Sequence, residues 1–204
     1  MNQAEIRALE IQCFPVAGVD EVGRGALFGE VVAAAVILPL DQLAMLENLG
    51  VTDSKKLSAS RRENLDQAIR ALAIACEIGI ASVSEIDAMN ILAASLLAME
   101  RAIAQLKPQP QHCLVDGNQK LRFQLIAPIP QTTVIKGDAL CLSIAAASIV
   151  AKVWRDRRMV ELAEVYRGYD LATNKGYGTA KHREAIAQIG YSEMHRRSFT
   201  LKKI

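Results

Sequence analysis

The sequence has few aromatic side chains, no closely spaced cysteine pair and no long hydrophobic run. Its longest apolar stretch, residues 139–151, is 13 residues long and lies between Asp138 and Lys152. A membrane-spanning helix needs about 18 to 20 uncharged residues, so we expect none. The start of the chain also lacks the basic residues, apolar stretch and cleavage site of a secretory signal. We therefore expect a cytoplasmic protein.

Patterns typical of zinc sites are missing as well. The four cysteines are 63, 37 and 28 residues apart, with no C-x-x-C pair and no histidine at zinc-ligand spacing. We interpret the cysteines as buried, reduced thiols: Cys13, Cys76, Cys113 and Cys141. The three histidines are equally scattered, and a surface or structural role is expected for His112, His182 and His195.

What is present suits one hydrophobic core. The chain has 204 residues, of which 51% are hydrophobic and 23% charged, so it needs no disulfide or structural metal to fold. Charge is unevenly distributed, because residues 1–151 carry 12 Lys and Arg against 16 Asp and Glu, whereas residues 152–204 carry 12 against 6. A basic last quarter fits a surface that binds a polyanion, although a solvated helix surface would have the same composition.

The first third of the chain predicts a hairpin. β-branched residues dominate residues 16–19 and 31–38, which are joined by a turn that contains Gly23, Arg24 and Gly25. Strand, glycine turn and strand are the simplest interpretation of this pattern.

Helices and a further strand are expected next. A capping box at Ser60 and apolar residues at helical spacing predict a helix to about Cys76. Residues 77–83 alternate enough to form a strand. A second helix is expected from Ser84 to about Leu106, where Lys107 and Pro108 end it.

The second half repeats this alternation. Short strands are expected at residues 112–115 and 132–135, a long alanine-rich helix over residues 142–165, and a last helix over residues 179–189 with Thr179 as its N-cap. Alternating strands and helices predict a mixed α/β sheet with helices on both faces. A small helical segment completes the C-terminus.

Three carboxylates end predicted strands: Asp20, Asp116 and Asp138. If these strands are neighbours in one sheet, the side chains converge at its edge, and like charges at close range repel unless cations neutralise them. Oxygen ligands without His or Cys favour Mg²⁺ or Mn²⁺ over zinc. Two such ions suit phosphodiester hydrolysis. The alternative is that each aspartate beside a glycine is a turn former.

Glu21 complicates the cluster. Adjacent strand residues point to opposite faces, so Glu21 cannot simply line up beside Asp20. We expect the turn at Gly23 to bring Glu21 round to the same site.

The glycine turn permits several interpretations. A dinucleotide-binding loop needs a helix after its glycines, but residues 31–38 predict a strand, so a Rossmann-type site is a weak alternative. Paired glycines suit either a close backbone approach by a ligand, with Arg24 meeting a nucleic-acid backbone, or a tight turn with an exposed arginine.

Two other segments carry cations. Lys55 and Lys56 follow Asp53-Ser54 in a loop and by themselves indicate only surface charge. Lys175-Gly176-Tyr177 combines a cation, flexible backbone and an aromatic ring, which suit a phosphate and a stacked sugar or base.

Together these segments resemble ribonuclease HII, the type 2 ribonuclease H family. The matching motifs occur in family order from about residue 15 to 199: AGVDEVGRG at 17–25, VVAAAV at 31–36, DSKKLS at 53–58, VDGN at 115–118, KGD at 136–138, IAAASIVAKVWRDR at 144–157, KGY at 175–177 and HRRSF at 195–199. Two positions depart from the pattern: Glu30, where the family commonly has proline or a small residue, and Asn174, where a histidine is frequent.

The resemblance implies a single ribonuclease H-like catalytic domain over residues 1–204, with a basic substrate-contacting segment over about 165–204. It implies metal-dependent endonucleolysis of RNA in RNA/DNA hybrids and nicking 5′ of ribonucleotides embedded in duplex DNA, which leaves 3′-hydroxyl and 5′-phosphate ends. By motif position, two Mg²⁺ or Mn²⁺ ions would be held by Asp20, Glu21, Asp116 and Asp138. Recognition of the ribose 2′-hydroxyl would fall to Gly23, Arg24, Gly25 and Tyr177, and contact with the adjacent phosphate to Lys55.

The leading hypothesis is therefore a monomeric endoribonuclease that acts on hybrids and on DNA containing ribonucleotides, away from membranes. The competing hypothesis is a nucleic-acid-binding protein without hydrolytic activity, whose carboxylates are structural turn residues.

Overall fold

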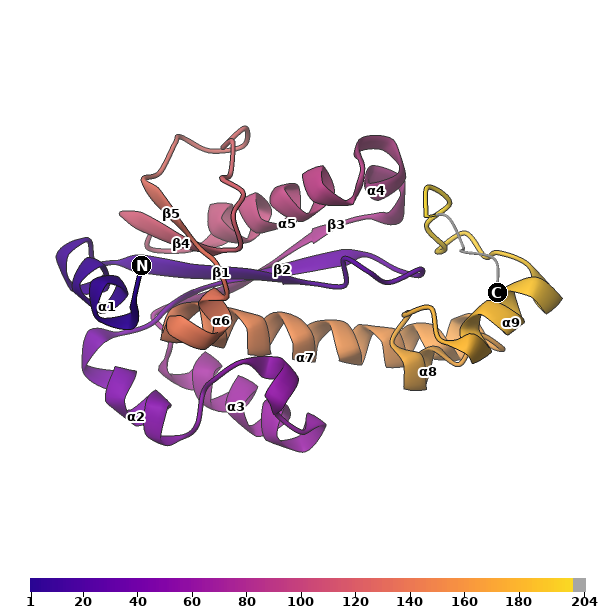
Figure 1. Ribbon diagram of the computed structural model, residues 1–204, viewed down its shortest axis with the longest axis horizontal. Coiled ribbons are helices and arrows are strands. Elements are labelled where there is room, and N and C mark those ends of the chain that lie inside the picture. Colours follow the sequence, from indigo (N-terminus) through magenta and orange to yellow (C-terminus); the bar gives the residue numbers. More distant parts are fainter. Residues whose placement is uncertain (200–204) are drawn as a thin grey trace.

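The computed structural model describes residues 1–199 and has a five-stranded sheet at its centre, with strand order β3-β2-β1-β4-β5 (Figure 1). The strands are β1 (Val16–Val22), β2 (Val31–Ile37), β3 (Ala75–Ala81), β4 (His112–Asp116) and β5 (Gln131–Val134). β2 pairs antiparallel with both β1 and β3, whereas β4 pairs parallel with both β1 and β5. The predicted mixed sheet and the β1–β2 hairpin are confirmed.

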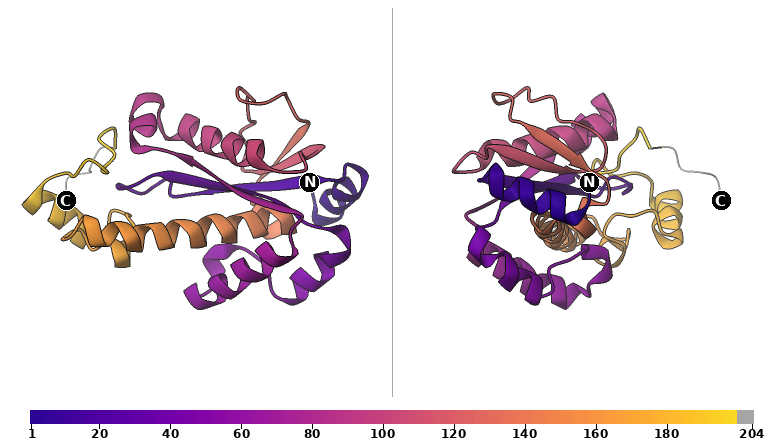
Figure 2. Two further views of the ribbon diagram at one scale, coloured as in Figure 1. Left: turned by 180° about the vertical axis from the view of Figure 1, so that it is seen from behind. Right: turned by 60° about the vertical axis from the view of Figure 1, so that its left-hand side comes forward.

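Helices cover both faces of the sheet (Figures 1 and 2). On one face lies α5 (Ile91–Gln105), and on the other lie α7 (Leu142–Val165) and α3 (Ala59–Leu72). The remaining helices are α1 (Gln3–Gln12), α2 (Leu43–Asn48), α4 (Val83–Met89), α6 (Gly137–Leu140), α8 (Leu171–Asn174) and α9 (Ala180–Ile189), with 3₁₀ turns at Leu40–Gln42 and Ser54–Lys56. In the described part of the chain, no helix is long and apolar enough to cross a membrane.

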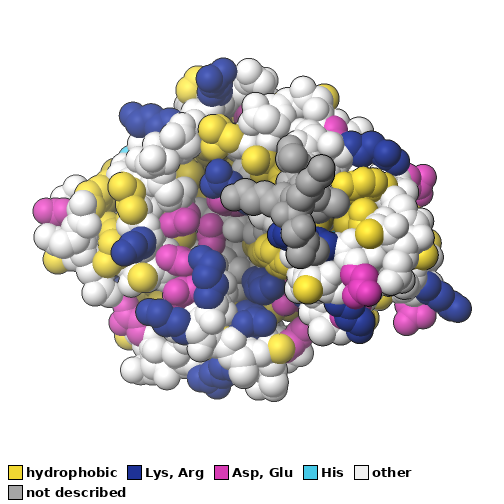
Figure 3. All heavy atoms as spheres, turned by 45° about the vertical axis from the view of Figure 1, so that its right-hand side comes forward, with side chains coloured by type: hydrophobic (Ala, Val, Ile, Leu, Met, Phe, Trp, Pro, Cys, Tyr) yellow, Lys and Arg dark blue, Asp and Glu magenta, His cyan; other side chains and the backbone are white. Residues whose placement is uncertain are grey.

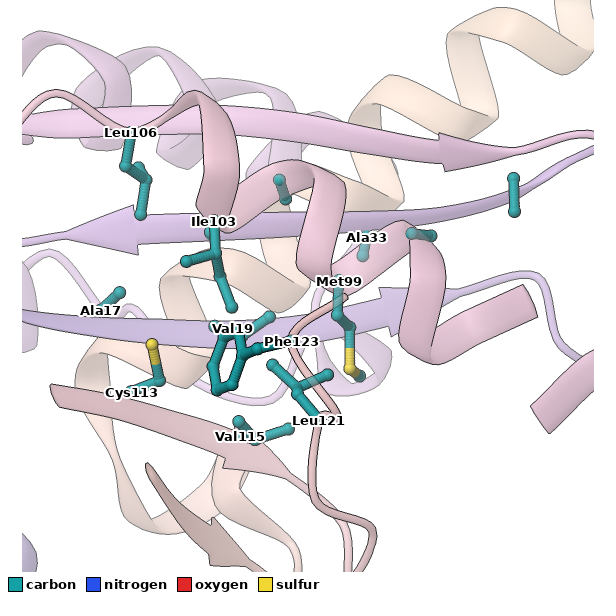
Figure 4. Packing of buried hydrophobic residues seen from close by; sticks show 14 of the residues in the cluster. Ala17, Val19, Ala33, Met99, Ile103, Leu106, Cys113, Val115, Leu121 and Phe123 are labelled. Carbon is teal, nitrogen blue, oxygen red and sulfur yellow. The ribbon is translucent and has the colours of Figure 1, made fainter. Parts of the chain in front are cut away.

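Strand β2 shows how the sheet divides the core. Ala33 and Ala35 pack in the cluster on the α5 face, whereas Ala34 and Val36 pack in the cluster on the α7 face. Because both faces are covered, all residues of β2 are buried, which explains its continuous apolar run. Figure 4 shows the cluster on the α5 face, where Met99 and Ile103 of α5 lie over side chains of β1 and β2.

Two glycines let the helices approach the sheet closely. A Cβ at Gly18 of β1 would collide with the backbone of Ser143 in α7, and one at Gly79 of β3 would collide with the backbone of Ala98 in α5. Only glycine leaves room for backbone against backbone. The start of α7 is therefore seated directly on β1, next to Asp20.

α7 continues beyond the sheet and carries the C-terminal lobe, which we define as residues 166–199 (Figure 1). The segment between β1 and β2, residues 23–30, lies against this lobe, and we call it the glycine loop. Backbone bridges join Ala26 to Tyr177 and Phe28 to His195. Phe28 is fully buried in an apolar cluster of lobe side chains. The glycine loop thus packs against lobe residues that are distant from it in sequence.

The helix predicted from Ser60 to Cys76 begins and ends earlier than expected. Ser58 is the N-cap, with its side chain accepting from the Arg61 N–H, and the helix ends at Leu72. The Ile74 N–H already donates to the Ile37 carbonyl at 2.9 Å. Sheet pairing with β2 therefore replaces the last expected helical turn, and β3 begins at Ala75 rather than residue 77.

The single helix predicted from Ser84 to Leu106 is two helices. The N-cap of α4 is Ser82, which forms a capping box with Glu85. Asn90 then breaks the helix with a φ of 76°, and its side chain accepts from the N–H groups of Leu92 and Ala93. The cap of α5 competes successfully with helix continuation at this residue.

Some of the remaining expectations are confirmed and others are not. The bounds of α7 and the Thr179 cap of α9 are confirmed. Helices α1 and α2 were not predicted. The four cysteines are free, as expected, but Cys13 and Cys76 are only partly buried.

Candidate active site

Asp20 and Asp116 lie at neighbouring positions on two parallel strands. Val19 of β1 pairs with Val115 of β4, so the next residue on each strand is an aspartate at the same level of the sheet. Asp116 is the last residue of β4. Parallel strands bring their carboxyl ends to one edge, and the structure brings these two predicted carboxylates together there.

Asp20 is the most buried of the predicted carboxylates, with 6% of its surface exposed. Burial raises its pKa well above the ordinary value, and the charges of Glu21 and Asp116 raise it further. The Ser148 hydroxyl on α7 and the Glu21 N–H, which donates to Asp20 Oδ1 at 2.7 Å, oppose this shift. A carboxylate in this position favours a bound proton or cation.

Glu21 reaches the same site without the turn that the sequence interpretation required. β1 continues to Val22, with Glu21 paired opposite Ala33. Arg24 Nη1 donates to Glu21 Oε1 at 3.2 Å. Burial raises the pKa of Glu21, Arg24 works against that shift, and the charge of Asp116 adds to it. The strand end itself therefore places Glu21 within electrostatic range of Asp116.

Asp138 does not end a strand, contrary to expectation. It lies in the first turn of α6, beyond Lys136, whose φ of 57° makes the turn after β5. The backbone of this turn also contacts Asp116, because the Gly137 N–H donates to Asp116 Oδ1 at 2.7 Å. Burial raises the pKa of Asp116, and the charge of Asp138 contributes. A helix turn, not a strand end, thus delivers Asp138 to the cluster.

Lys55 lies beside the carboxylates, with its Nζ 3.5 Å from Asp138 Oδ2. Partial burial works against its charge, but Asp138, Asp20 and Asp53 outweigh that and raise the pKa of Lys55. Its side chain is 81% exposed. The ammonium can therefore contact a ligand while it remains close to the acidic cluster.

Contacts with α7 and α3 fix the loop that carries Lys55. Ser54 is buried, and its Oγ is 2.9 Å from Ser148 Oγ on α7. Arg62 Nη1 donates to the Ser54 carbonyl at 3.1 Å. Lys56 points to solvent. Of the two adjacent lysines, the structure therefore brings only Lys55 to the site.

The donor set suits a hard divalent cation, since it consists of buried or half-buried carboxylate oxygens with no thiolate or imidazole. In the arrangement described for residues 1–199, no group of three or more His, Cys, Asp or Glu side chains meets the geometry for holding a metal ion. One oxygen of each of the four carboxylates instead faces a protein N–H or cation. Metal binding by these residues stays a prediction. Figure 3 shows acidic side chains gathered at a hollow, with basic side chains around it.

The two predicted glycines of the turn have different structural requirements. Gly23 has a φ of +92°, and a Cβ there would collide with the Arg155 side chain. Gly25 has no left-handed φ, and a Cβ there would have no neighbour within 4 Å. The fold therefore requires glycine at Gly23, whereas Gly25 presents an open backbone surface that a ligand could approach.

Tyr177 lies on the lobe side of the glycine loop, paired with Ala26. Its ring has Lys152 Nζ at 5.9 Å and Arg155 Cζ at 5.5 Å from the centroid. The side chain of Asn174 has a structural role, because it accepts from the Gly176 N–H at 2.8 Å and donates to the Tyr169 carbonyl at 2.7 Å. Asn174 thus holds the turn that positions Tyr177.

Two of the three histidines, His182 and His195, form a buried pair. His182 Nε2 and His195 Nε2 are 3.2 Å apart. Since the Ser192 N–H can only donate, His195 Nδ1 accepts it at 2.9 Å, and His195 Nε2–H then donates to His182. His182 Nδ1–H in turn donates to the Tyr177 carbonyl at 2.9 Å. Neither sequence spacing nor composition indicated this chain of contacts.

Solved structures that share this fold include ribonuclease H enzymes. The ribonuclease H2 of Pyrococcus horikoshii OT3 superimposes with a TM-score of 0.76 at 28% identity, over 90% of this chain and 93% of that one. A complex of Bst-RNase HIII with Mn²⁺ shares the fold at 24% identity, with a TM-score of 0.75, over 90% of this chain and 66% of that one. The fold is therefore that of the ribonuclease H-like nucleases.

The sequence comparisons identify the family within this class. The family model described as Ribonuclease HII matches residues 17–202. The ribonuclease HII of Trichodesmium erythraeum is 58% identical over 199 residues, which cover 98% of this chain and 93% of the relative. The chain belongs to the ribonuclease HII family and is an endoribonuclease of the ribonuclease H type.

Proposed function

We propose that this endoribonuclease hydrolyses the RNA strand of RNA/DNA hybrids and nicks duplex DNA 5′ of single embedded ribonucleotides, leaving 3′-hydroxyl and 5′-phosphate ends. The observation that carries the proposal is the meeting of Asp20 and Asp116 at one sheet edge, with Glu21 and Asp138 in electrostatic range. Crowded, buried carboxylates are costly unless cations neutralise them. The family relationship supplies the reaction class.

In this proposal Asp20, Glu21, Asp116 and Asp138 hold two divalent cations, Mg²⁺ or Mn²⁺. Such ions, when bound, activate a water and stabilise the leaving oxygen of a phosphodiester. The Mn²⁺ named for the Bst-RNase HIII structure supports this choice of metal by analogy of fold. One oxygen of each carboxylate accepts from a protein donor, and a carboxylate can accept a hydrogen bond and coordinate a cation together.

Lys55 and the glycine loop supply substrate contacts. The exposed Lys55 ammonium lies 3.5 Å from Asp138, so it can bind a phosphate next to the scissile bond. Arg24, with half of its side chain exposed, and the open backbone at Gly25 face outward beside Glu21. Together with Tyr177 they recognise the ribose 2′-hydroxyl, the group that distinguishes RNA from DNA at a single position.

The basic segment over about residues 165–204 contributes contacts to the nucleic-acid backbone, and we propose that it and the sheet form one catalytic domain that acts as a monomer. Its last five residues, 200–204, lie outside the described residues. The described part of the segment packs on α7 beside the glycine loop. This position supports a role for its cations on the substrate side of the site.

The test uses a DNA duplex that carries one ribonucleotide. We expect the full chain to nick it 5′ of the ribonucleotide with Mg²⁺ or Mn²⁺ and not with chelator. Asp20→Asn should abolish nicking while the fold persists, and Asp41→Asn, an exposed carboxylate on the surface, should not change it. Nicking that survives chelation, or equal nicking by Asp20→Asn, would contradict the proposal. Binding without nicking in any metal would favour the non-hydrolytic alternative.

A further inference from the structure

Two arginines in the C-terminal half are completely buried. Arg155 on α7 has 0% of its surface exposed and Arg196 in the lobe has 1%. In the part of the chain that the structure describes, neither forms an ion pair with a carboxylate. Buried guanidinium groups without an ionic partner are expensive, so their hydrogen bonds must be accounted for.

All three donor positions of Arg155 contact backbone carbonyls. Nη2 donates to Phe28 at 3.1 Å and Nε to Glu30 at 3.2 Å, both in the glycine loop. Nη1 donates to Lys175 at 2.8 Å, in the turn before Tyr177. One planar group therefore holds the loop and this turn at a fixed separation.

Arg196 does the same from the other side of the loop. Its Nη1 donates to the carbonyl of Arg24 at 3.0 Å, Nε to that of Gly29 at 2.8 Å and Nη2 to that of Glu30 at 3.0 Å. Each donor of this fork therefore faces a different residue of the loop. The carbonyl of Arg24, next to the open backbone of Gly25, is fixed by one of them.

The loop needs these donors because it has little regular structure of its own. Buried backbone carbonyls require partners. Backbone N–H groups supply them for Gly23, which accepts from Ala26, and for Leu27, which accepts from Arg196. The two guanidinium groups supply them for the loop carbonyls named above. A guanidinium presents its N–H groups in a rigid fork, so it fixes the spacing between carbonyls as well as satisfying them. Apolar side chains of similar volume would fill the same space but would leave the carbonyls free.

Glu30 lies close to both arginines without pairing with them. Its carboxylate Oε1 is 3.9 Å from Arg158 Nε, and its Oε2 is buried with no hydrogen-bond partner among the described residues. Burial lowers the pKa of both arginines, and with the charge of Arg155 it lowers that of Arg196 to about 9, whereas the charge of Glu30 favours the charged forms of both. Glu30 thus compensates part of the buried positive charge.

We propose that Arg155 and Arg196 are positioning residues for ribonucleotide recognition: they hold the glycine loop and the Tyr177 turn in one rigid arrangement, so that a single 2′-hydroxyl is recognised without loop adjustment. The proposal rests on the proposed function of this loop. Arg155 also packs on the Tyr177 ring, 5.5 Å from its centroid. It therefore contacts both sides of the recognition site.

The test compares two substrates with lysine variants that keep the charge but lose the fork, Arg155→Lys and Arg196→Lys. A continuous hybrid offers a 2′-hydroxyl at every RNA position, whereas a duplex with one ribonucleotide offers only one. A displaced loop should therefore lower kcat/KM about tenfold more on the single-ribonucleotide duplex than on the hybrid. Equal losses on both substrates would overturn the proposal.

The matched control is Leu162→Ala, which loosens the apolar cluster around Phe28 without removing any carbonyl contact. It should lower thermal stability and leave the ratio between the two substrates within twofold. A selectivity loss in Leu162→Ala as large as in the lysine variants would also overturn the proposal, because instability of the lobe would then explain both.

A second measurement needs no variant. In the free wild-type protein, ¹⁵N relaxation of the Arg24–Gly29 amides should give order parameters close to those of β1, about 0.85, and values below about 0.6 would refute a preformed loop. This readout does not depend on activity. If the wild type fails to nick the single-ribonucleotide duplex while the loop is rigid, the proposed function fails and the positioning geometry does not.

Discussion

The carboxylate edge of the sheet and the arginine-held C-terminal lobe bury charge in opposite ways. At the sheet edge, Asp20 and Asp116 lie at neighbouring positions, and burial and mutual repulsion raise the pKa of both. Arg155 on α7 and Arg196 in the lobe are even more buried, yet each of their side-chain nitrogens donates to a backbone carbonyl. The first region has four carboxylates, of which Glu21 and Asp138 pair with the exposed cations Arg24 and Lys55, and it is suited to bind further cations. The second region is satisfied by its own hydrogen bonds and is suited to hold a shape.

The largest effect is expected where charge is least compensated. Asp116→Asn should reduce nicking about 10³-fold, since it removes a charge on which metal binding depends. The variant should unfold at the same or a higher temperature in metal-free buffer, because it relieves repulsion between buried carboxylates. Single-turnover nicking and thermal unfolding measure the two effects. A rate within threefold of the wild type would remove Asp116 from the site.

The next effect separates the two glycines of the turn. Gly23→Ala should destabilise the protein by about 3 kcal/mol, from a disfavoured left-handed backbone and a collision with Arg155. Gly25→Ala should change stability by less than about 0.5 kcal/mol and instead reduce nicking at a single ribonucleotide. Denaturant unfolding and nicking assays on both variants test this. Similar stability losses in both would show that the loop requires Gly25 as well.

Acid should act oppositely on the two regions of the metal-free protein. His195 has a folded pKa of about 4, lowered by burial and then by the charge of His182. Because the unfolded chain binds this proton more tightly, with a pKa of about 6.5, the contribution of neutral His195 to stability is fully present above about pH 6.5. This contribution should fall by about 2 kcal/mol as the pH drops from about 6.5 to 4.5.

The raised pKa values at the sheet edge have the opposite sign, because the folded state binds those protons more tightly and gains stability as the pH falls. Asp20→Asn removes part of that gain, so the free energy of unfolding of the whole protein should fall more steeply in acid than it does in the wild type. His195→Gln should flatten the decrease. Denaturant titrations at several pH values measure these slopes. An Asp20→Asn slope equal to that of the wild type would contradict the assigned signs.

The smallest effect on the fold is expected at Arg24. Arg24→Ala removes a half-exposed side chain and a partner of Glu21, so stability should change by less than about 0.5 kcal/mol. The preference for a ribonucleotide junction should fall about tenfold, the value of roughly one good charged contact. Arg157→Ala, equally exposed on α7, is the control and should keep the preference. Retained preference in Arg24→Ala would refute its role.

The contrast also shows where sequence patterns sufficed. The β1–β2 hairpin, α7 and α9 follow from local signals: β-branched runs around a glycine turn, an alanine-rich helix and the Thr179 cap. The proximity of Asp20 and Asp116 followed from the strand pattern, because two parallel strands carry them to one edge, but the same reasoning was wrong for Asp138. Local signals failed where two structures compete for the same residues, as at Asn90, where a cap displaced helix continuation. Tertiary pairing likewise ended α3 early.

The two buried arginines, Arg155 on α7 and Arg196 in the lobe, could not be predicted in this way. Arg155 was part of a recognised motif and Arg196 lay in another, but nothing in either motif says that both guanidinium groups meet the same loop. Their partners are backbone carbonyls, which every residue possesses and which therefore leave no mark in the sequence. The His182–His195 contact is hidden for a similar reason, since two isolated histidines carry no spacing signal.

The amino-acid sequence alone determined the family, the mixed α/β fold class and the β1–β2 hairpin, because these depend on short motifs and local periodicity. Only the tertiary structure decided that Glu21 reaches the site from within a strand, that Asp138 arrives on a helix turn, and that Gly23 and Gly25 have different requirements. Those outcomes depend on which groups lie within a few ångströms after packing, and contacts between segments distant along the chain are not written in either segment.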